Sequence, residues 1–205
     1  MIKVGITGNI GSGKTLVCRI FEHLGISVFY SDSRAKEYYY QEDVKDKIKQ
    51  LFGEKVFTAG NEIDLKKISQ IVFADAQSLN ILNAIIHPLV LEEYEAWISE
   101  HQNETYTLFE SALLYPCKLT HLFNKIIFVD ASQDLRIERV MQRDKTSLKF
   151  VKQRIENQFI EKNNSFNPDF IILNDEQQLV LPQVIEIHQL LEFGILKNNA
   201  LVKNK

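Results

Sequence analysis

The sequence predicts an α/β fold of three layers, in which a five-stranded parallel sheet carries helices on both faces. Short apolar, β-branched segments alternate along the chain with segments of helical periodicity, which is typical of a parallel sheet. The 205 residues are 45% hydrophobic and 25% charged, so the chain is long enough and apolar enough to bury a substantial core. Four of the eight glycines fall in the first thirteen residues, which indicates a backbone that must bend sharply near its start.

The predicted elements follow from these patterns in order. Strands are expected at Ile2–Thr7, Ile26–Tyr30, Tyr106–Phe109, Lys125–Val129 and Phe170–Leu173. Helices are expected at Lys14–Leu24, from a cap at Ser31 or Asp32 towards Tyr40, Asp43–Phe52, Leu65–Ala74, Ser78–His101, Asp134–Arg143, Ser147–Lys162 and Glu176–Phe193. We expect the second strand to lie beside the first, as in a doubly wound sheet.

We expect one domain made of three regions. A core that contains all five strands comprises residues 1–32, 104–133 and 168–193. A helical region spans residues 33–103, and a helical hairpin spans residues 134–165. The length of the chain favours a single domain with inserted regions over two independent domains.

The strongest motif is a phosphate-binding loop between the first strand and the first helix. The segment Gly8–Thr15 fits the pattern G-x-x-x-x-G-K-[ST] at every fixed position. Its glycines let backbone N–H groups turn towards phosphate oxygens, and the helix start adds partial positive charge. Lys14 supplies an ammonium for the β- and γ-phosphates, and Thr15 supplies a hydroxyl for Mg²⁺. The residues assigned to the nucleotide here are Gly8, Gly11, Ser12, Gly13, Lys14 and Thr15.

The motifs of other nucleotide-binding classes are missing from the sequence. No aspartate has a glycine three residues later, and Asn124-Lys125 is not followed by the aspartate of a guanine-binding motif. The apolar run that ends at Asp130 continues with Ala131 and lacks the glutamate of a motor ATPase. These absences favour a small-molecule kinase. A kinase for another alcohol and a regulatory nucleotide-binding module are the alternatives.

A kinase also needs a carboxylate for the acceptor hydroxyl and arginines for the transferring phosphoryl group. Asp32 follows the second strand and is the candidate base, although a helix cap is an alternative role for it. Arg136, Arg139 and Arg143 share one face of a helix, and Arg154 follows on the next. A solvated charged face is the alternative, but the planar guanidinium suits phosphate oxygens.

Composition excludes several other functions. A protein that coats nucleic acid needs a basic surface, whereas this chain has a net charge of −3, so we expect no nucleic-acid partner. The sequence has no secretory signal pattern and no apolar run of about 18 residues, so we expect no membrane partner. Cys18 and Cys117 lack metal or redox spacing, so reduced thiols and a cytoplasmic location are expected. The sequence makes no prediction of oligomeric state.

Over Ile2 to about Glu192, the chain resembles the dephospho-coenzyme A kinase family. The resemblance is carried by an ordered set of motifs: Gly5–Thr15, Tyr30–Ala35, Ile86–Val90, Arg139 with Gln142–Asp144, Arg154-Ile155 with Gln158, and Asp169–Asn174. The glycine-rich loop alone is common to many families, whereas the ordered set is specific. The resemblance implies a P-loop kinase fold and ATP-dependent phosphorylation of the ribose 3′-hydroxyl of dephospho-coenzyme A, the final step of coenzyme A synthesis.

The resemblance also implies roles for particular residues. It places the ATP phosphates on Gly11–Leu16 and makes Asp32 the general base. Residues 33–103 form the family's helical acceptor-binding region, and His87 belongs to it, although a core histidine before a helix bend is an alternative. Residues 134–165 form the lid, in which Arg139 and Arg143 match lid arginines, and Arg154 is assigned to the substrate. Asn174 is placed near the adenine, with a plain turn residue as its alternative.

Three positions depart from the family's pattern. Leu16 stands where many members carry a second hydroxyl residue. The family's Pro-Leu-Leu-aromatic-Glu element reads Ala112–Pro116, so its glutamate is missing. Glu110, at the end of the third strand, is an alternative carboxylate for Mg²⁺-bound water. Glu176 replaces a glycine that commonly follows the asparagine region, which weakens the prediction of an adenine contact.

Overall fold

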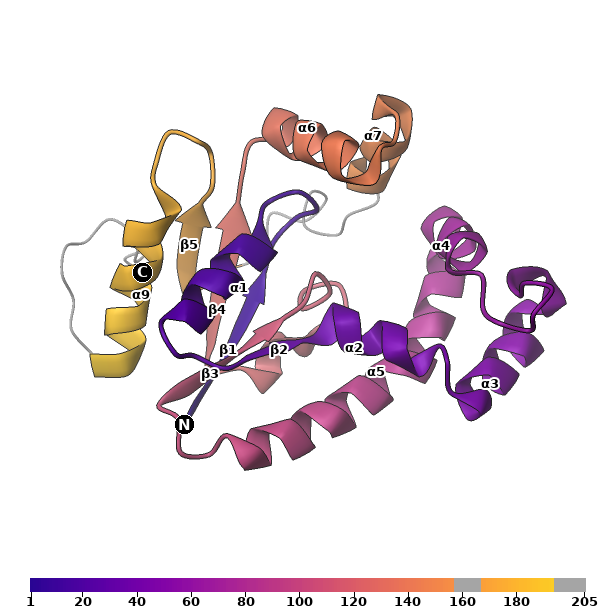
Figure 1. Cartoon of the computed structure of the whole chain (residues 1–205), viewed down its shortest axis with the longest axis horizontal. Helices are drawn as coiled ribbons and strands as arrows, with labels where there is room; N and C mark the ends of the chain where they lie inside the picture. The colour runs from indigo at the N-terminus through magenta and orange to yellow at the C-terminus, as the bar shows by residue number, and fades with distance from the viewer. Residues whose placement is uncertain (157–166, 194–205) are drawn as a thin grey trace. The chain divides into compact units, whose positions relative to one another are not determined.

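A computed structural model describes residues 1–156 and 167–193 of the chain (Figure 1). The chain divides into two compact units, each with its own packing. One unit joins Met1–Tyr30 to His101–Lys205 and contains the sheet. The other unit is Ser31–Glu100 and contains helices α2 to α5.

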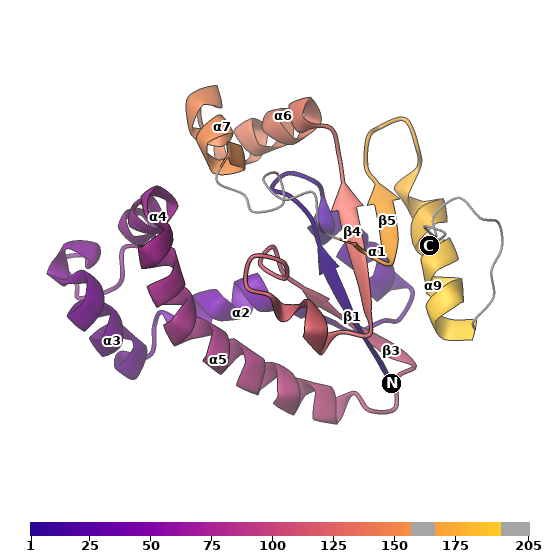
Figure 2. The same cartoon turned by 180° about the vertical axis from the view of Figure 1, so that it is seen from behind.

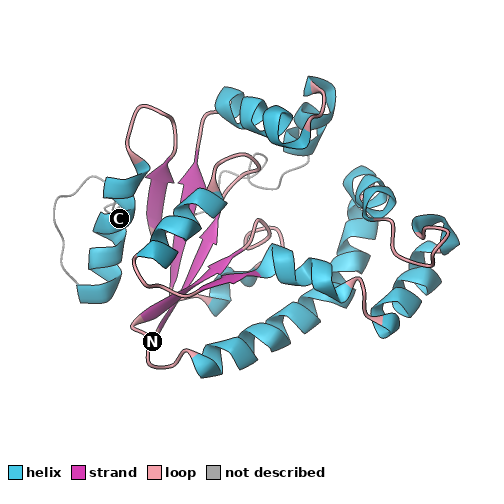
Figure 3. Ribbon diagram, viewed as in Figure 1, coloured by secondary structure: helices cyan, strands magenta, loops and turns pink. Residues whose placement is uncertain are grey.

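The first unit is built on five parallel strands (Figure 3). They are β1 (Ile2–Thr7), β2 (Val28–Tyr30), β3 (Tyr106–Glu110), β4 (Lys125–Asp130) and β5 (Phe170–Leu173). Their order across the sheet is β2-β3-β1-β4-β5, and every neighbouring pair is parallel. The predicted α/β fold with a five-stranded parallel sheet is confirmed.

The strand order corrects one expectation from the sequence. We expected β2 to lie beside β1, but β3 separates them. In the register, Glu110 at the end of β3 is opposite Ile6 of β1 and Tyr30 of β2. The carboxyl ends of these three strands therefore meet at one edge of the sheet, the edge at which parallel α/β sheets bind ligands.

Helices α1 (Lys14–His23) and α9 (Val180–Phe193) pack on the same face of the sheet (Figure 2). Their apolar side chains join alternate residues of the strands in one core, of which Val4, Phe21 and Ile187 are fully buried members. Burial of one such side chain stabilises the fold by roughly 1.5–3 kcal/mol. The opposite face carries an aromatic stack, because Phe109 contacts Phe29 and Phe123 at ring distances of 5.5 and 5.1 Å.

Two further helices of this unit follow β4. Helix α6 (Gln133–Asp144) begins after Ser132, whose hydroxyl accepts a hydrogen bond from the Leu135 amide. Helix α7 is Leu148–Glu156, so the remainder of the helix expected to reach Lys162 lies outside the described residues, as does the end of the predicted lid. A short 3₁₀ helix, η2 (Leu119–Leu122), precedes β4.

The second unit is helical. It contains α2 (Ser31–Tyr38), α3 (Glu42–Phe52), the 3₁₀ helix η1 (Glu54–Val56), α4 (Leu65–Ala74) and α5 (Ala76–Glu100). The Tyr38 hydroxyl donates to the Leu89 carbonyl at 3.0 Å and to Glu93 Oε2 at 3.1 Å, which ties α2 to α5. No helix in the described part of the chain combines the length and the apolar composition needed to cross a bilayer.

Most predicted helix starts lie within two residues of the observed ones, and the starts of α2 and α9 differ in ways that bear on the site. Helix α2 begins at Ser31 itself, so Asp32 is its second residue and lies inside the first turn, not before it as a cap. Helix α9 begins at Val180, four residues after the predicted start at Glu176. Asp175 Oδ1 accepts hydrogen bonds from the Gln177 and Gln178 amides, and Glu176 has a φ of 64°. The residues before Val180 therefore form a turn.

Candidate functional site

The loop between β1 and α1 is shaped to hold an anion. Gly13 is the N-cap of α1, with φ 94° and ψ 26°, and it provides no side-chain cap. The first amides of a helix have no partner within the helix, and the helix dipole places partial positive charge there. The start of α1 therefore presents N–H groups suited to phosphate oxygens, as the motif predicts.

The side chains of this loop take distinct positions. The Lys14 ammonium donates to the Gly8 carbonyl at 3.0 Å, which folds the lysine over its own loop. Thr15 and Leu16 are exposed in the first turn of α1. Ser12 is fully buried, and its amide donates to the Asn9 carbonyl at 3.1 Å. The predicted phosphate-binding residues thus form one continuous structure.

Asn174 closes this loop from the end of β5. Its side-chain amide donates to the Ser12 carbonyl at 2.8 Å, and its backbone amide donates to the Asp130 carbonyl at 2.8 Å. A Cβ added to Gly13 would overlap the Asn174 amide nitrogen. Glycine at position 13 is therefore required both by its φ of 94° and by the closeness of Asn174.

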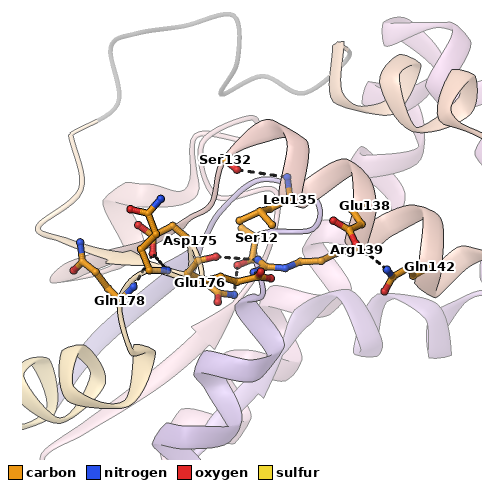
Figure 4. A network of polar contacts seen from close by, with 11 residues as sticks. Ser12, Ser132, Leu135, Glu138, Arg139, Gln142, Asp175, Glu176 and Gln178 are labelled. Carbon is orange, nitrogen blue, oxygen red and sulfur yellow. Dashed lines mark hydrogen bonds and ion pairs between the residues drawn. The ribbon is translucent and has the colours of Figure 1, made fainter.

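Arg139 extends the network from Asn174 to the next loop (Figure 4). Its Nη1 donates to the Asn174 carbonyl and its Nη2 to Glu176 Oε1, each at 3.0 Å. A hydrogen-bonded path therefore runs from the Ser12 carbonyl through Asn174 and Arg139 to Glu176. Glu176, noted in the sequence only as a departure from the family pattern, is an ion-pair partner of a predicted lid arginine.

Helix α6 packs directly on the phosphate-binding loop. A Cβ at Gly11 would lie 2.6 Å from the Arg136 carbonyl oxygen and 3.0 Å from Val140 Cγ2. Ile10 packs against a small core formed by Val140 of α6 with Val151 and Ile155 of α7. The α6–α7 hairpin is therefore anchored to the loop by apolar contacts.

The four arginines of this hairpin do not share one role. Arg136 is buried, and its Nε donates to the Ala131 carbonyl at 3.1 Å, so it does not join a common exposed face as the sequence predicts. Arg143 and Arg154 both bind Asp144, the last residue of α6. These ion pairs lower the pKa of Asp144, with the Arg143 hydrogen bond as the largest cause.

Glu110 is buried at the carboxyl edge of the sheet, opposite the last residues of β1 and β2. Its position follows from the strand order, which the sequence pattern did not reveal. Among the described residues, no cluster of three carboxylate, histidine or cysteine side chains could hold a metal ion by itself. A magnesium ion at this edge would therefore need oxygens from a nucleotide and from water as well.

In the helical unit, α2 and α5 bring two predicted site residues within electrostatic range. Burial lowers the pKa of His87, and the negative charge of Asp32 partly offsets that effect. Arg34, on the same helix as Asp32, pairs with Glu93 of α5 at 3.2 Å. The structure thus groups Asp32 with His87 in one unit and the phosphate-binding loop, Asn174 and the arginines in the other.

A family model described as Dephospho-CoA kinase matches residues 2–179. Among curated relatives, the dephospho-CoA kinase of Bacteroides fragilis strain YCH46 is 33% identical over 187 residues, covering 91% of each chain. The dephospho-CoA kinase of Porphyromonas gingivalis is 35% identical over 189 residues, covering 91% of this chain and 93% of the relative.

Solved structures agree with this fold. A protein from Thermus thermophilus has a TM-score of 0.79 and 27% identity, covering 91% of this chain and 95% of its own. Dephospho-CoA kinase from Campylobacter jejuni has a TM-score of 0.64 and 24% identity, with coverages of 94% and 98%. Shikimate kinase from Acinetobacter baumannii shares the P-loop kinase fold at a TM-score of 0.56 and 14% identity, with coverages of 96% each. Taken with the geometry of the loop and its arginines, these matches establish that the chain belongs to the dephospho-CoA kinase family.

Proposed function

We propose that this protein transfers the γ-phosphoryl group of ATP to the ribose 3′-hydroxyl of dephospho-coenzyme A, giving coenzyme A and ADP. Family membership over residues 2–179 supports the reaction and both substrates. The observation that carries the proposal is the uncapped start of α1 at Gly13, with the Lys14 ammonium folded over the loop. This arrangement suits the phosphates of a nucleoside triphosphate.

In the proposed complex, the amides of Gly11–Leu16 bind the phosphate oxygens of ATP, and Lys14 exchanges the Gly8 carbonyl for the β- and γ-phosphates. Gly8 and Gly13 allow the backbone to bend, and Ser12 is the buried residue of the loop. Asn174 supports the loop through the Ser12 carbonyl. We assign Asn174 to the adenine side of the nucleotide, as the family resemblance implies. Positioning of this kind provides most of the catalysis in phosphoryl transfer.

We propose that Thr15 holds Mg²⁺ through its hydroxyl, with Glu110 acting through metal-bound water. The exposed Thr15 hydroxyl in the first turn of α1 and the buried carboxylate at the edge of the sheet are chemically suited to that ion. When bound, the ion neutralises charge on the β- and γ-phosphates. The requirement for oxygens from nucleotide and water agrees with Mg²⁺, which retains several waters in most sites.

Asp32 is the proposed general base. It comes two residues after Tyr30, the end of β2, and carboxylates of aspartate are ionised at neutral pH. Its carboxylate orients the 3′-hydroxyl and accepts the proton as the new O–P bond forms. We also assign His87 and Arg154 to the acceptor. The negative charge of Asp32 acts on His87, since it raises the pKa of that histidine against the larger lowering by burial.

Arg139 and Arg143 are the proposed lid arginines that neutralise the transferring phosphoryl group. Closure of the α6–α7 hairpin over ATP would exclude the water that otherwise hydrolyses it. The contact of Ile10 with the core of this hairpin supports a connection between loop and lid. Both arginines already bind acidic partners, so they change or share partners when ATP binds.

The test is a panel of acceptors incubated with ATP and Mg²⁺ and assayed for ADP release. Dephospho-coenzyme A should stimulate release strongly, whereas nucleosides, nucleotides and shikimate should not. Stimulation by one of those other alcohols alone would identify a different P-loop kinase. ATP binding without stimulation by any acceptor would identify a regulatory module. Omission of Mg²⁺ from the same assay tests the metal requirement.

We also propose a cytoplasmic location and a small-molecule substrate as the principal partner. The free thiols of Cys18, which is buried, and of Cys117 are those expected in a reducing compartment. Fractionation of cells that express a tagged form of the chain tests this location.

A further inference from the structure

We propose that Asp144 is a positioning residue that holds Arg143, the arginine for the transferring phosphoryl group, beside Arg154, the arginine for the acceptor. This inference rests on the proposed function, because it assigns Asp144 a purpose in that reaction.

The contacts at the end of α6 define the pair. Asp144 Oδ1 accepts from Arg143 Nε at 2.7 Å, and Oδ2 accepts from Arg143 Nη2 at 3.1 Å. Oδ2 also accepts from Arg154 Nη1 at 2.7 Å. One carboxylate therefore fixes the plane of one guanidinium from two points and links it to the arginine of the next helix.

The position of Asp144 at the end of a helix indicates that its negative charge serves to bind the two arginines. A negative side chain in the last turn of a helix is unfavourable because it opposes the helix dipole. Asp144 is the final residue of α6, and Lys145 after it is left-handed, with a φ of 48°. Two guanidinium groups offset that cost, and their contacts lower the pKa of Asp144.

Ordering matters most for Arg143, whose side chain is 61% exposed. A free arginine side chain loses rotamer entropy when it binds a phosphate. Asp144 removes part of that entropy beforehand and engages only Nε and one Nη, so the Nη1 hydrogens of Arg143 can reach another acceptor. Two positive charges and one negative charge leave a net charge of +1, which still attracts an anion.

The pair also lies on an element joined to the phosphate-binding loop. Val140, one turn before Asp144, packs with Ile10 and approaches the Gly11 backbone. Val151 and Ile155 of α7 complete that small core, and Arg154 lies beside Ile155 in the sequence. This small core therefore joins the phosphate-binding loop to the helices that carry both arginines.

The test compares Asp144→Asn with a matched control, Glu138→Gln. Glu138 is an exposed acid on the same helix, and its carboxylate accepts a hydrogen bond from the side-chain amide of Gln142. We expect Asp144→Asn to lower kcat about tenfold with dephospho-coenzyme A, within the range of measured couplings between contacting residues, while Glu138→Gln changes kcat less than about twofold. An unchanged kcat in Asp144→Asn, or a lower KM for ATP at unchanged kcat, would overturn the proposal.

A double-mutant cycle separates positioning from a merely structural role. Lysine at position 143 cannot make the two-point contact, so Asp144→Asn should cost less than about twofold further in kcat when added to Arg143→Lys. Additive losses overturn the proposal. Because loss of the ion pairs also weakens the α6–α7 corner, Asp144→Glu is the second variant, and its kcat should lie nearer the wild type than that of Asp144→Asn. A kcat equal to or below that of Asp144→Asn contradicts the proposal.

The wild-type assay distinguishes this proposal from the one on which it rests. If wild-type protein releases no ADP in response to dephospho-coenzyme A, the proposed function fails before any variant is compared. If wild-type protein responds and the cycle is additive, only the role of Asp144 fails.

Discussion

The side-chain amide of Asn174 donates to the backbone carbonyl of Ser12 at 2.8 Å, across 162 positions of sequence. Both residues are buried, so the hydrogen bond joins the last strand of the sheet to the centre of the phosphate-binding loop away from solvent. A buried carbonyl that loses its partner is costly, and this gives Asn174 a structural reason for its identity.

Asn174→Ala should therefore weaken both the fold and ATP binding. Loss of the donor leaves the Ser12 carbonyl without this partner, at an expected cost of about 1–3 kcal/mol in the free energy of unfolding. The loosened loop should raise the Kd for ATP about tenfold, which corresponds to about 1.4 kcal/mol. Urea unfolding and ATP titration measure the two effects. Asn167→Ala, at an exposed position, is the control, and equal losses in the two variants would contradict the role of Asn174.

Gly13 and Gly25 offer a matched pair of glycines, with φ of 94° and 88°. Alanine at either position incurs left-handed backbone strain of about 1–2 kcal/mol. Only at Gly13 would the new Cβ overlap Asn174, whereas Gly25 has nothing within 4 Å. Gly13→Ala should therefore lose about 1–3 kcal/mol more stability than Gly25→Ala and should bind ATP poorly. Thermal unfolding and ATP titration test this, and similar behaviour of the two variants would refute the packing argument.

The phosphate-binding loop was predictable from sequence because its chemistry is local. Gly8 to Thr15 must bend, end a strand and begin a helix within a few residues, and each requirement restricts the residue type. The strands were predictable for a similar reason, since apolar β-branched runs identify buried strands. Glu110 was noticed as a carboxylate after the third strand, but its position between β1 and β2 depends on strand order. Hydrophobic pattern does not encode which distant strands pair, so that order was predicted wrongly.

Long-range contacts also explain the other differences. Arg136 has the same helical spacing as Arg139 and Arg143, yet it turns to the Ala131 carbonyl and is buried. Helix α9 begins later than the sequence predicts, because the Asp175 carboxylate accepts hydrogen bonds from the Gln177 and Gln178 amides. Glu176 adopts a left-handed conformation that glycine also accepts, and its ion pair with Arg139 becomes visible only in the folded chain.

The partly buried His87 should make stability depend on pH in the acidic range. Burial lowers the pKa of His87 below its value in the unfolded chain, and Asp32 only partly opposes this. As pH falls through about 6.5, the unfolded state takes up the proton first, so stability is lost as pH falls and is fully present above that range. The contribution of one such proton is at most about 1.4 kcal/mol per pH unit.

His87→Gln should remove that contribution. Between pH 7.5 and 5.5, wild-type protein should lose more unfolding free energy than the His87→Gln variant, measured by urea denaturation without substrate. His121→Gln, at an exposed histidine, should lose stability in parallel with the wild type. If the unfolding free energies of His87→Gln and the wild type fall equally with pH, the pKa of His87 is the same in the folded and unfolded states, and the prediction is wrong.

Asp32→Asn is the decisive variant for the proposed base, since it replaces one carboxylate oxygen with an NH2 group and keeps the shape of the side chain. ATP binding is measured by titration, and ADP release stimulated by dephospho-coenzyme A is measured on the same sample. We expect a turnover lower by about 10²–10⁴ with the Kd for ATP nearly unchanged, because the base acts on the acceptor and not on the nucleotide. Near-normal turnover at unchanged ATP affinity would contradict the role of Asp32 as that base.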